Sequence, residues 1–229
     1  MMRKKAGKFF IIAIDGPAGS GKSTTARKVA QRLGFFFLDS GAMYRAVTWL
    51  ALENKVALND SSALAVLAEK AVIDFRQQDG KQLIFVNGQD ITRQIRLPDV
   101  TNAIAPIAAN PVVRKILVEK QRVFGKLGNL VAEGRDIGTV VFPNADLKIY
   151  LNAPAKVRAR RRVTELAEQG VEADFAAIYS ALLLRDANDS NREHSPLRRA
   201  KGAVELDTGD LTIDEQVDRV VRLAKERME

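Results

Sequence analysis

The chain has 229 residues, of which 46% are hydrophobic and 28% are charged, and this size and composition suit one α/β domain with a buried core. The sequence contains no cysteine, which excludes disulfides, cysteine–zinc sites and thiol catalysis and is typical of the reducing cytoplasm. The net charge of +8 suits a nucleic acid, an acidic membrane surface or a small anionic substrate as partner.

The N-terminal residues are basic and then apolar, as in a signal peptide. The apolar run at residues 9–14 is too short for a signal-peptide core, and Asp15 follows it. No stretch approaches the roughly 18 apolar residues of a membrane span. Aromatic residues make up only 6% of the chain and do not interleave with the basic run at residues 158–162, which disfavours single-stranded nucleic acid. We therefore expect a cytoplasmic monomer that binds neither membrane nor nucleic acid.

The first elements in chain order are strand, loop, helix and strand. Residues 9–14 predict a buried strand, and residues 22–33 predict a helix that ends at Gly34. Residues 35–41 predict a second buried strand. Such a βαβ unit implies a parallel sheet with helices on both faces, so the predicted fold class is an α/β three-layer sandwich.

The later elements continue this pattern, with one interruption. Helices are predicted over residues 43–52, 61–71, 111–125, 157–169 and 174–188, and strands over residues 129–134, 146–153 and 202–208. Thr212 and Glu215 form a capping box that opens a C-terminal helix. Between residues 72 and 96, short β-rich runs are separated by Asp79-Gly80 and Asn87-Gly88, which are hairpin signals. We expect a small antiparallel insertion of about three strands there.

A phosphate-binding loop follows the first strand. Residues 16–23 read GPAGSGKS and match G-x-x-x-x-G-K-[ST], a pattern whose backbone amides point at phosphate from a helix N-terminus. Lys22 would reach the β- and γ-phosphates, and the Ser23 hydroxyl would bind Mg²⁺. A glycine-rich turn without a ligand is the alternative, but the flanking strand and helix favour a nucleotide. The pattern therefore predicts a site for a nucleoside triphosphate with Mg²⁺ at residues 16–23.

Two more polar clusters follow predicted strands. Residues 39–45 (DSGAMYR) end in Tyr44 and Arg45 near the start of a helix, where an arginine either binds a phosphate or carboxylate or lies on the surface. Residues 132–143 (AEGRDIGTVVFP) crowd acidic and basic groups into one turn. These groups either bind a ligand or pair with one another, and their place at a strand's carboxyl end favours binding. Asp15 ends the first strand and could hold a loop amide or a metal-bound water.

A third cluster lies in residues 184–192 (LRDANDSNR). Arg185, Asp189 and Arg192 recur at i, i+4 and i+7, so on one helix they would share a face. A solvated salt-bridge face is the other interpretation of this spacing.

A nucleoside triphosphate site alone is compatible with a switch GTPase, a motor ATPase or a small-molecule kinase. Guanine-specific switches usually carry N-K-x-D, which this chain lacks. The sequence at residues 39–45 alone would also be compatible with a shikimate-type kinase, although the insertion and the third cluster argue against that class.

The motifs GPAGSGKST, DSGAMYR, EGRDIGTVVFP and RDANDSNR together resemble those of bacterial cytidylate kinases, which are nucleoside monophosphate kinases of the P-loop NTPase class. The resemblance covers residues 9–226, and the insertion strengthens it, because these enzymes carry an extra small sheet in their monophosphate-binding domain. It implies one kinase domain over residues 1–229. The core would span about 8–39, 115–153 and 200–229, the monophosphate-binding region about 40–114 and a helical lid about 154–192. The implied activity is ATP- and Mg²⁺-dependent phosphorylation of CMP and dCMP in pyrimidine metabolism, with UMP or a shikimate-like acceptor as the alternative.

The resemblance also implies roles for individual residues. The residues that would bind ATP are Gly16, Pro17, Ala18, Gly19, Ser20, Gly21, Lys22, Ser23 and Thr24. Ser40, Tyr44 and Arg45 would line the monophosphate pocket, with Arg45 and Arg135 on the acceptor phosphate. Arg114 and Asp136 would meet the cytosine, and Arg185 and Asp189 the sugar hydroxyls. Arg192 would face the nucleotide phosphates. The implied catalytic residues are Lys22, Arg135, Arg185 and Arg192, and the implied lid arginines are Arg158, Arg161 and Arg162.

One departure from the family pattern bears on base selection. Ala105 stands near the position of a serine that these enzymes often use to help read the base. The chemistry itself needs no general base, because a phosphate monoester with a second pKa of about 6 is mostly a dianion near neutral pH. We therefore expect the single histidine, His194, to have no catalytic role.

Overall fold

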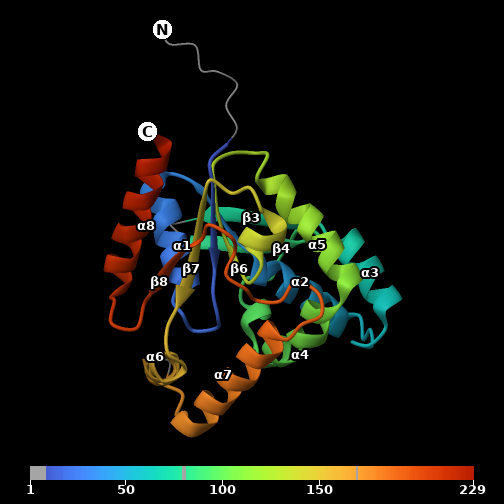
Figure 1. Cartoon of the computed structure of the whole chain (residues 1–229). Coiled ribbons are helices and arrows are strands. Elements are labelled where there is room, and N and C mark those ends of the chain that lie inside the picture. The colour runs from blue at the N-terminus through green and yellow to red at the C-terminus, as the bar shows by residue number, and fades with distance from the viewer. Residues whose placement is uncertain (1–8, 79–80, 169) are drawn as a thin grey trace. The chain divides into compact units, whose positions relative to one another are not determined.

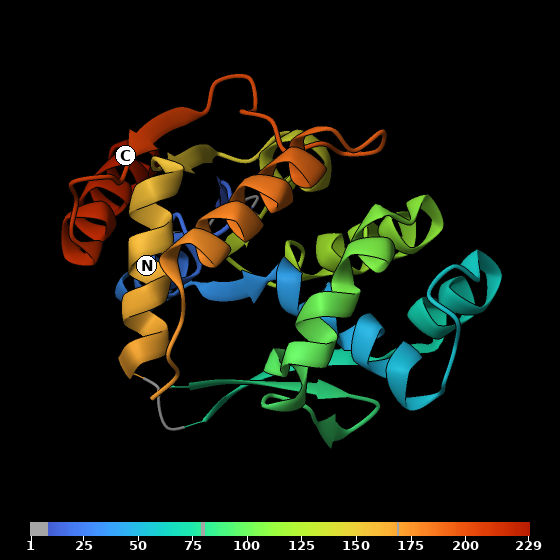
Figure 2. The ribbon, with the colours of Figure 1, turned by 90° about the horizontal axis from the view of Figure 1, so that it is seen from below.

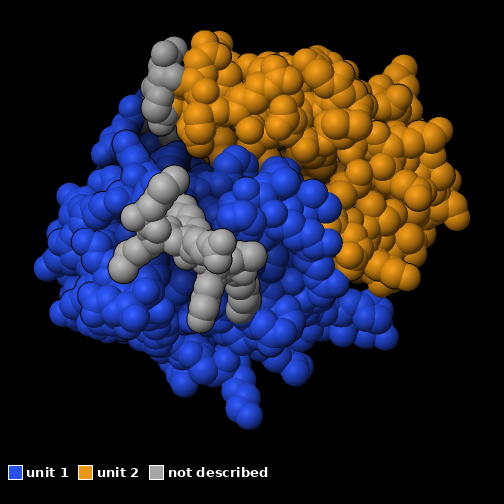
Figure 3. Space-filling model, turned by 90° about the horizontal axis from the view of Figure 1, so that it is seen from above, with its two compact units in different colours: residues 1–38, 122–229 blue, residues 39–121 orange. Residues whose placement is uncertain are grey.

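The computed structural model describes residues 9–78, 81–168 and 170–229. The chain divides into two compact units. Unit 1 comprises Met1–Leu38 and Arg122–Glu229, and unit 2 comprises Asp39–Gln121 (Figure 3). No helix among the described residues is long and apolar enough to cross a membrane.

Unit 1 is built on a five-stranded sheet in the order β2-β6-β1-β7-β8 (Figure 1). Its pairs β1–β6, β1–β7 and β7–β8 are parallel, as the predicted α/β fold requires. The elements in chain order are β1 (Ile11–Asp15), α1 (Lys22–Leu33), β2 (Phe36–Asp39, whose last residue opens unit 2), β6 (Leu130–Gly134), the π-helical turn η2 (Ile137–Val141), β7 (Leu147–Asn152), α6 (Ala155–Glu168), α7 (Phe175–Ser190), β8 (Val204–Asp207) and α8 (Ile213–Met228).

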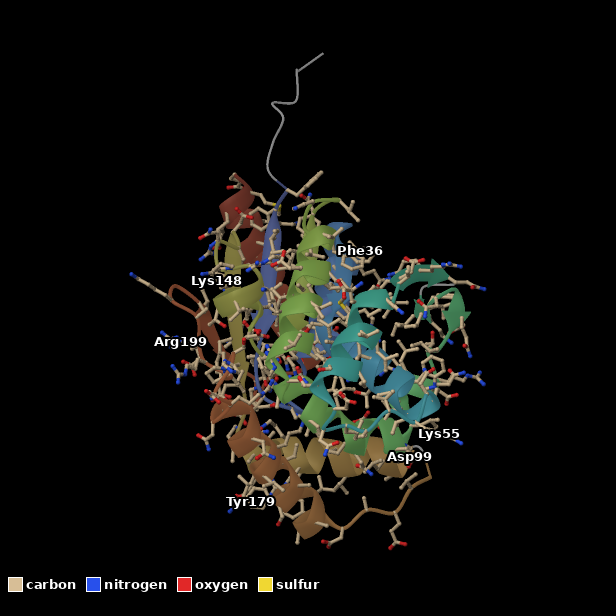
Figure 4. All side chains as sticks on the ribbon, turned by 90° about the vertical axis from the view of Figure 1, so that its right-hand side faces the viewer. Phe36, Lys55, Asp99, Lys148, Tyr179 and Arg199 are labelled. Carbon is tan, nitrogen blue, oxygen red and sulfur yellow. The ribbon has the colours of Figure 1, made fainter. Side chains whose placement is uncertain are left out.

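The core of unit 1 forms where α1 and α8 cover one face of this sheet. Ile12 and Ile14 of β1 pack with Val29 of α1 and with Val217 and Val220 of α8, and each of these five side chains is fully buried. β1 is the central strand, so its near-continuous apolar sequence is explained by burial on both faces. At the edge strand β2, the ring of Phe36, which Figure 4 labels, stacks on that of Phe124, with centroids 5.5 Å apart.

Two further helices of unit 1 follow the carboxyl end of β7. The strand ends at Asn152 and α6 begins at Ala155, and α7 then packs beside α6 (Figure 2). Asp174 caps α7 by accepting a hydrogen bond from the Ala177 amide at 2.7 Å. The predicted capping box at the start of α8 is confirmed, because Thr212 and Glu215 bond reciprocally to each other's amides.

Unit 2 combines helices with a three-stranded antiparallel sheet, β3-β4-β5, which confirms the predicted insertion. The predicted turn at Asn87-Gly88 joins β4 to β5, and both residues have positive φ angles; the other predicted turn, Asp79-Gly80, lies outside the described residues. Its elements are α2 (Ser40–Glu53), α3 (Ser61–Lys70), β3 (Ile73–Gln78), β4 (Lys81–Val86), β5 (Gln89–Asp90), the 3₁₀ turn η1 (Gln94–Arg96), α4 (Pro98–Ala109) and most of α5 (Pro111–Phe124).

Two local predictions were wrong, and one helix was missed. The second strand ends at Asp39 rather than at residue 41, and α2 begins at Ser40 rather than at residue 43, because the Asp39 carboxylate caps the helix by accepting a bond from Ala42 N at 2.8 Å. The helix α4 was not predicted from the sequence. Arg192 does not share a helical face with Arg185 and Asp189, because α7 ends at Ser190.

Candidate functional site

The phosphate-binding loop connects β1 to α1 in unit 1. Gly16 is required at its start, because a Cβ there would lie 2.2 Å from the carbonyl oxygen of Leu151. The loop ends at Gly21, directly before the first residue of α1. The backbone amides of this helix N-terminus therefore belong to the same turn as Lys22 and Ser23, which suits an anion.

Lys22 is almost completely buried, and its ammonium group donates to the carbonyl oxygen of Pro17 at 3.1 Å. Burial is the largest cause that lowers the pKa of Lys22, and the positive charges of Arg135 and Arg185 add to it against the opposing charge of Glu133, so that the pKa falls to about 7. Several cations thus act on one small volume, and a bound anion would relieve their repulsion.

Ser23 and Glu133 offer two oxygen atoms near Lys22 that could act as metal ligands. The Ser23 hydroxyl donates to the Glu133 carboxylate at 2.5 Å, and β6 places Glu133 in register with Ile14 of β1. Among the described residues no group of three or more His, Cys, Asp or Glu side chains could hold a metal by itself. A hydroxyl with one carboxylate suits a hard cation that takes its other ligands from phosphate and water, as Mg²⁺ does.

Asp189 joins two of the predicted arginines. Its carboxylate accepts a bond from Arg135 Nε at 2.6 Å and another from Arg192, which reaches back to α7 from beyond the helix end. Burial of Asp189 opposes ionisation, but the charges of Arg135 and Arg192 outweigh it and lower the pKa of the carboxyl. Asp189 therefore stays ionised and orients both guanidinium groups.

The three arginines predicted for a lid point to different partners. Arg158, on α6, is buried and donates to the carbonyl oxygens of Ala153 at 2.8 Å and Ala18 at 2.9 Å. Arg161 donates to the Thr208 carbonyl oxygen, whereas Arg162 forms a half-exposed pair with Glu165.

Further side chains, which were not predicted from the sequence, hold this region together. Asp186 on α7 accepts from Arg158 Nη2 at 2.5 Å, so one guanidinium joins the phosphate-binding loop to α7. The buried Thr208 hydroxyl donates to the Ser20 carbonyl oxygen at 3.1 Å. Carbonyls of the loop are thus bonded to Arg158 and Thr208, and no local spacing signals these contacts, which span 140 and 188 residues.

Unit 2 contains four of the predicted site residues, Ser40, Tyr44, Arg45 and Arg114. Ser40 and Tyr44 lie buried in the first turns of α2, and Arg45 pairs with Asp39 at 3.0 Å. The Arg114 guanidinium of α5 lies 5.4 Å from the centre of the Tyr44 ring and donates to the Ala108 carbonyl oxygen at 2.9 Å. Two helices distant in sequence, α2 and α5, therefore bring Tyr44 and Arg114 together within this unit.

The remaining residues singled out in the sequence have plain locations. Asp136 is buried at the start of η2, Ala105 is an exposed residue of α4, and His194 is exposed after α7. Asp15 bonds loop amides with both carboxylate oxygens, to Ile137 N at 2.8 Å and Gly138 N at 2.7 Å, which is one of its two predicted uses.

Comparison with known proteins places this site in a family context. A family model described as cytidylate kinase matches residues 12–226. The chain is 46% identical over 217 residues to a cytidylate kinase of Geobacillus sp. (strain WCH70), covering 95% of this chain and 97% of that protein. It is 45% identical over 222 residues to a cytidylate kinase of Listeria innocua, covering 97% and 99%.

Two other matches have different coverage or similarity. A bifunctional pantoate ligase/cytidylate kinase of Synechococcus elongatus is 48% identical over 222 residues, which cover 95% of this chain and 42% of that protein. A crystal structure of an uncharacterized protein from Eubacterium ventriosum shares the fold with a TM-score of 0.51 at 12% identity, over 94% of this chain and 98% of that one.

Proposed function

Because the chain belongs to the cytidylate kinase family, we propose that it transfers the γ-phosphoryl group of ATP to CMP or dCMP and forms CDP or dCDP. The observation that carries the proposal is the phosphate-binding loop with Lys22, which the charges of Arg135 and Arg185 also reach. Such a cluster suits a reaction that brings two polyanionic groups together.

On the donor side, residues 16–24 would hold ATP. Lys22 would leave Pro17 for the β- and γ-phosphates, whose negative charge restores its normal, protonated state. Ser23 would hold Mg²⁺, with Glu133 within hydrogen-bond distance of that hydroxyl. When bound, the metal neutralises charge on the phosphates and on the transferred group.

On the acceptor side, Arg45 and Arg135 would bind the phosphate of CMP, and Ser40 and Tyr44 would line the pocket for it. Arg114 and Asp136 would contact the base. Arg185 and Asp189 would contact the sugar hydroxyls, and Arg192 would face the phosphates. The pairing of Asp189 with Arg135 and Arg192 supports this assignment, since a carboxylate that already orients two guanidinium groups lowers the cost of ordering them around a substrate.

The proposed reaction needs positioning and charge compensation rather than proton abstraction. The acceptor phosphate is a dianion near neutral pH, with a second pKa of about 6, and attacks without a general base. Arg135, Arg185, Arg192 and Lys22 would stabilise the charge on the transferred group. The segment at about 154–192, with α6 and α7, would act as a lid that excludes water and so prevents hydrolysis of ATP.

The test is ADP release from Mg·ATP with CMP, dCMP, UMP, AMP and shikimate offered separately. Rapid turnover with CMP and dCMP and weak turnover with UMP would support the proposal. Equal rates with UMP would keep the reaction class but contradict cytosine selection, for which Ala105 would be the first residue to replace by serine. Turnover only with shikimate, or with none of the five acceptors, would refute the proposal.

We further propose that the protein acts as a cytoplasmic monomer in pyrimidine nucleotide metabolism. The absence of cysteine fits a reducing compartment. Light scattering at micromolar concentration tests the monomer, since a mass of twice 25.2 kDa would contradict it.

A further inference from the structure

Asp15 makes contacts that the proposed reaction does not use directly. It is the last residue of β1, only 2% exposed, and both of its carboxylate oxygens accept backbone hydrogen bonds. Oδ1 accepts from Ile137 N at 2.8 Å, and Oδ2 accepts from Gly138 N at 2.7 Å. One side chain thus holds two consecutive amides of the turn η2.

The two ends of this contact adjoin two different parts of the site. Asp15 directly precedes Gly16, the first residue of the phosphate-binding loop. Ile137 and Gly138 directly follow Arg135 and Asp136, which the proposed function assigns to the acceptor nucleotide. The contact spans more than 120 residues of sequence and lies entirely within unit 1.

The absence of a side chain at residue 138 is part of the same contact. A Cβ on Gly138 would lie 3.3 Å from Asp15 Oδ2 and 3.2 Å from the Ala200 Cβ. Both distances are tighter than ordinary van der Waals contact, so a larger residue would push η2 away from the carboxylate.

We propose that Asp15 is a positioning residue that fastens η2 to the root of the phosphate-binding loop and thereby sets the position of Arg135 and Asp136 for the acceptor. The inference rests on the proposed function. A displacement of about 1 Å between reacting groups can cost on the order of 100-fold in rate, so a contact of this kind affects turnover without touching a substrate.

The contact requires the ionised form of Asp15. A neutral acid, like an amide, would turn one donor toward a backbone N–H that is itself a donor. Burial, with a smaller contribution from the charge of Asp136, raises the pKa of Asp15 to about 7 against the opposing effect of the two amides and the charge of Arg135. Tyr150 pairs with Asp15 in register from β7, and the stem of Lys148 lies near Gly138.

The test compares Asp15→Asn with the wild type above pH 7, where the wild-type carboxyl is ionised. We expect kcat/KM for CMP to fall ten- to a hundredfold, while the affinity for a fluorescent ATP analogue changes less than about threefold. The ATP affinity should persist because Arg158 and Thr208 still hold the loop. Hydrogen exchange of residues 136–141, measured by mass spectrometry, should become faster. An Asp15→Asn enzyme with kcat/KM within twofold of wild type would overturn the proposal.

Asp146→Asn is the matched control. Asp146 Oδ2 accepts a bond from Ile11 N at 2.9 Å, so this carboxylate also fastens a backbone amide of unit 1, but at the opposite end of β1. We expect the substitution to lower stability and to leave both kcat/KM and exchange at residues 136–141 unchanged. Equal kinetic losses in both variants would mean that Asp15 is merely structural.

A second variant covers the case in which Asp15→Asn does not fold. Gly138→Ala keeps the carboxylate and both amide donors and only displaces the turn, so it should lower kcat/KM for CMP in the same direction but less. Unchanged kinetics in Gly138→Ala would also contradict the proposal. The two proposals can fail separately. Turnover of the wild type with CMP tests the proposed function, whereas hydrogen exchange at residues 136–141 needs no substrate and tests the contact of Asp15 by itself.

Discussion

Burial moves the pKa values of two site residues toward neutrality from opposite sides. It raises the pKa of Asp15 to about 7 and lowers the pKa of Lys22 to about 7, because a low-dielectric environment disfavours the charged form of each. The two residues have different uses for their charge. The carboxylate of Asp15 bonds two amides of the chain, whereas Lys22 donates to a single carbonyl oxygen and would gain most from a phosphate.

The raised pKa of Asp15 predicts a pH dependence of stability. Between about pH 4 and 7 the folded chain holds the Asp15 proton more tightly than the unfolded chain, so this contribution to stability is complete at low pH and is lost as the pH rises through 7. Between about pH 5 and 8, the free energy of unfolding of the wild type should fall relative to that of Asp15→Asn by on the order of 3 kcal/mol. Urea denaturation of both proteins checks this, and parallel pH profiles would contradict it.

Arg192 should matter to turnover far more than to folding. Its guanidinium is mostly buried and bonds to Asp189 alongside Arg135, which suits a group that compensates phosphate charge. We expect Arg192→Ala to lower kcat about 100-fold, the typical cost of removing one preorganised charge-stabilising group. Its thermal unfolding midpoint should stay close to that of the wild type.

The control for Arg192→Ala is Arg199→Ala. Arg199 pairs with Glu205 at the surface, where ion pairs contribute little to stability, and Figure 4 labels it. In steady-state kinetics we expect the Arg199→Ala variant to have the same kcat as the wild type. A folded Arg192→Ala enzyme that also turned over normally would remove Arg192 from the proposed mechanism.

At the scale of elements, Arg158 connects a helix to a loop. From the first turn of α6 its guanidinium reaches the carbonyl oxygen of Ala18 in the phosphate-binding loop and the carboxylate of Asp186 on α7. Because Arg158 binds the Ala18 carbonyl oxygen on one side of the loop, the backbone amides of the loop are favoured to point to the other side, toward the phosphate. The arginine assigned to a lid therefore also supports the loop.

This arrangement predicts the effect of Arg158→Lys. Lysine keeps the charge but has no planar fork, so it cannot bond Ala153, Ala18 and Asp186 at once. We expect KM for ATP to rise about tenfold, the equivalent of one hydrogen bond to a charged group, while KM for CMP changes little. The exposed pair of Arg32 with Asp218 offers Arg32→Lys as the control with unchanged constants. An equal rise of both KM values in Arg158→Lys would argue against a specific link to the ATP loop.

At the scale of the whole molecule, the net charge of +8 is compatible with either small phosphate ligands or a nucleic acid. Many of the arginines predicted for the site are paired: in unit 1 Arg135 and Arg192 contact Asp189 and Arg158 contacts Asp186, and in unit 2 Arg45 contacts Asp39. Charges arranged in this way suit small phosphate ligands better than a long nucleic-acid backbone.

Salt separates these two uses of positive charge. We expect kcat/KM for CMP to fall less than tenfold between about 50 and 200 mM salt, whereas a protein that contacts many nucleic-acid phosphates loses about 10³–10⁵ in affinity over that range. Fluorescence anisotropy with a labelled single-stranded RNA, measured over the same salt range, checks whether the protein binds nucleic acid in this way. Tight, saturable and steeply salt-dependent RNA binding would contradict the expectation that the protein acts only on small molecules.

Local signals in the sequence were sufficient to predict the α/β core, the antiparallel insertion and the phosphate-binding loop. A strand, a glycine-rich turn and a helix are encoded within residues 9–33, and Asn87-Gly88 and the Thr212 capping box each depend on near neighbours. These features could be predicted because periodicity and turn chemistry act over a few residues. The helix α4 could not be, since it contains Pro106 in its interior and packs against α2.

Only the tertiary structure decided the partners of the charged residues. Their spacing predicted Arg185, Asp189 and Arg192 on one helical face. Instead, Asp189 bonds both to Arg192 and to Arg135, which lies 54 residues before Asp189 in the chain. The amides that Asp15 holds and the carbonyl that Arg158 holds lie more than 100 residues away. Spacing along the chain determines which elements form, whereas the packing of the sheet and helices determines which of their side chains meet.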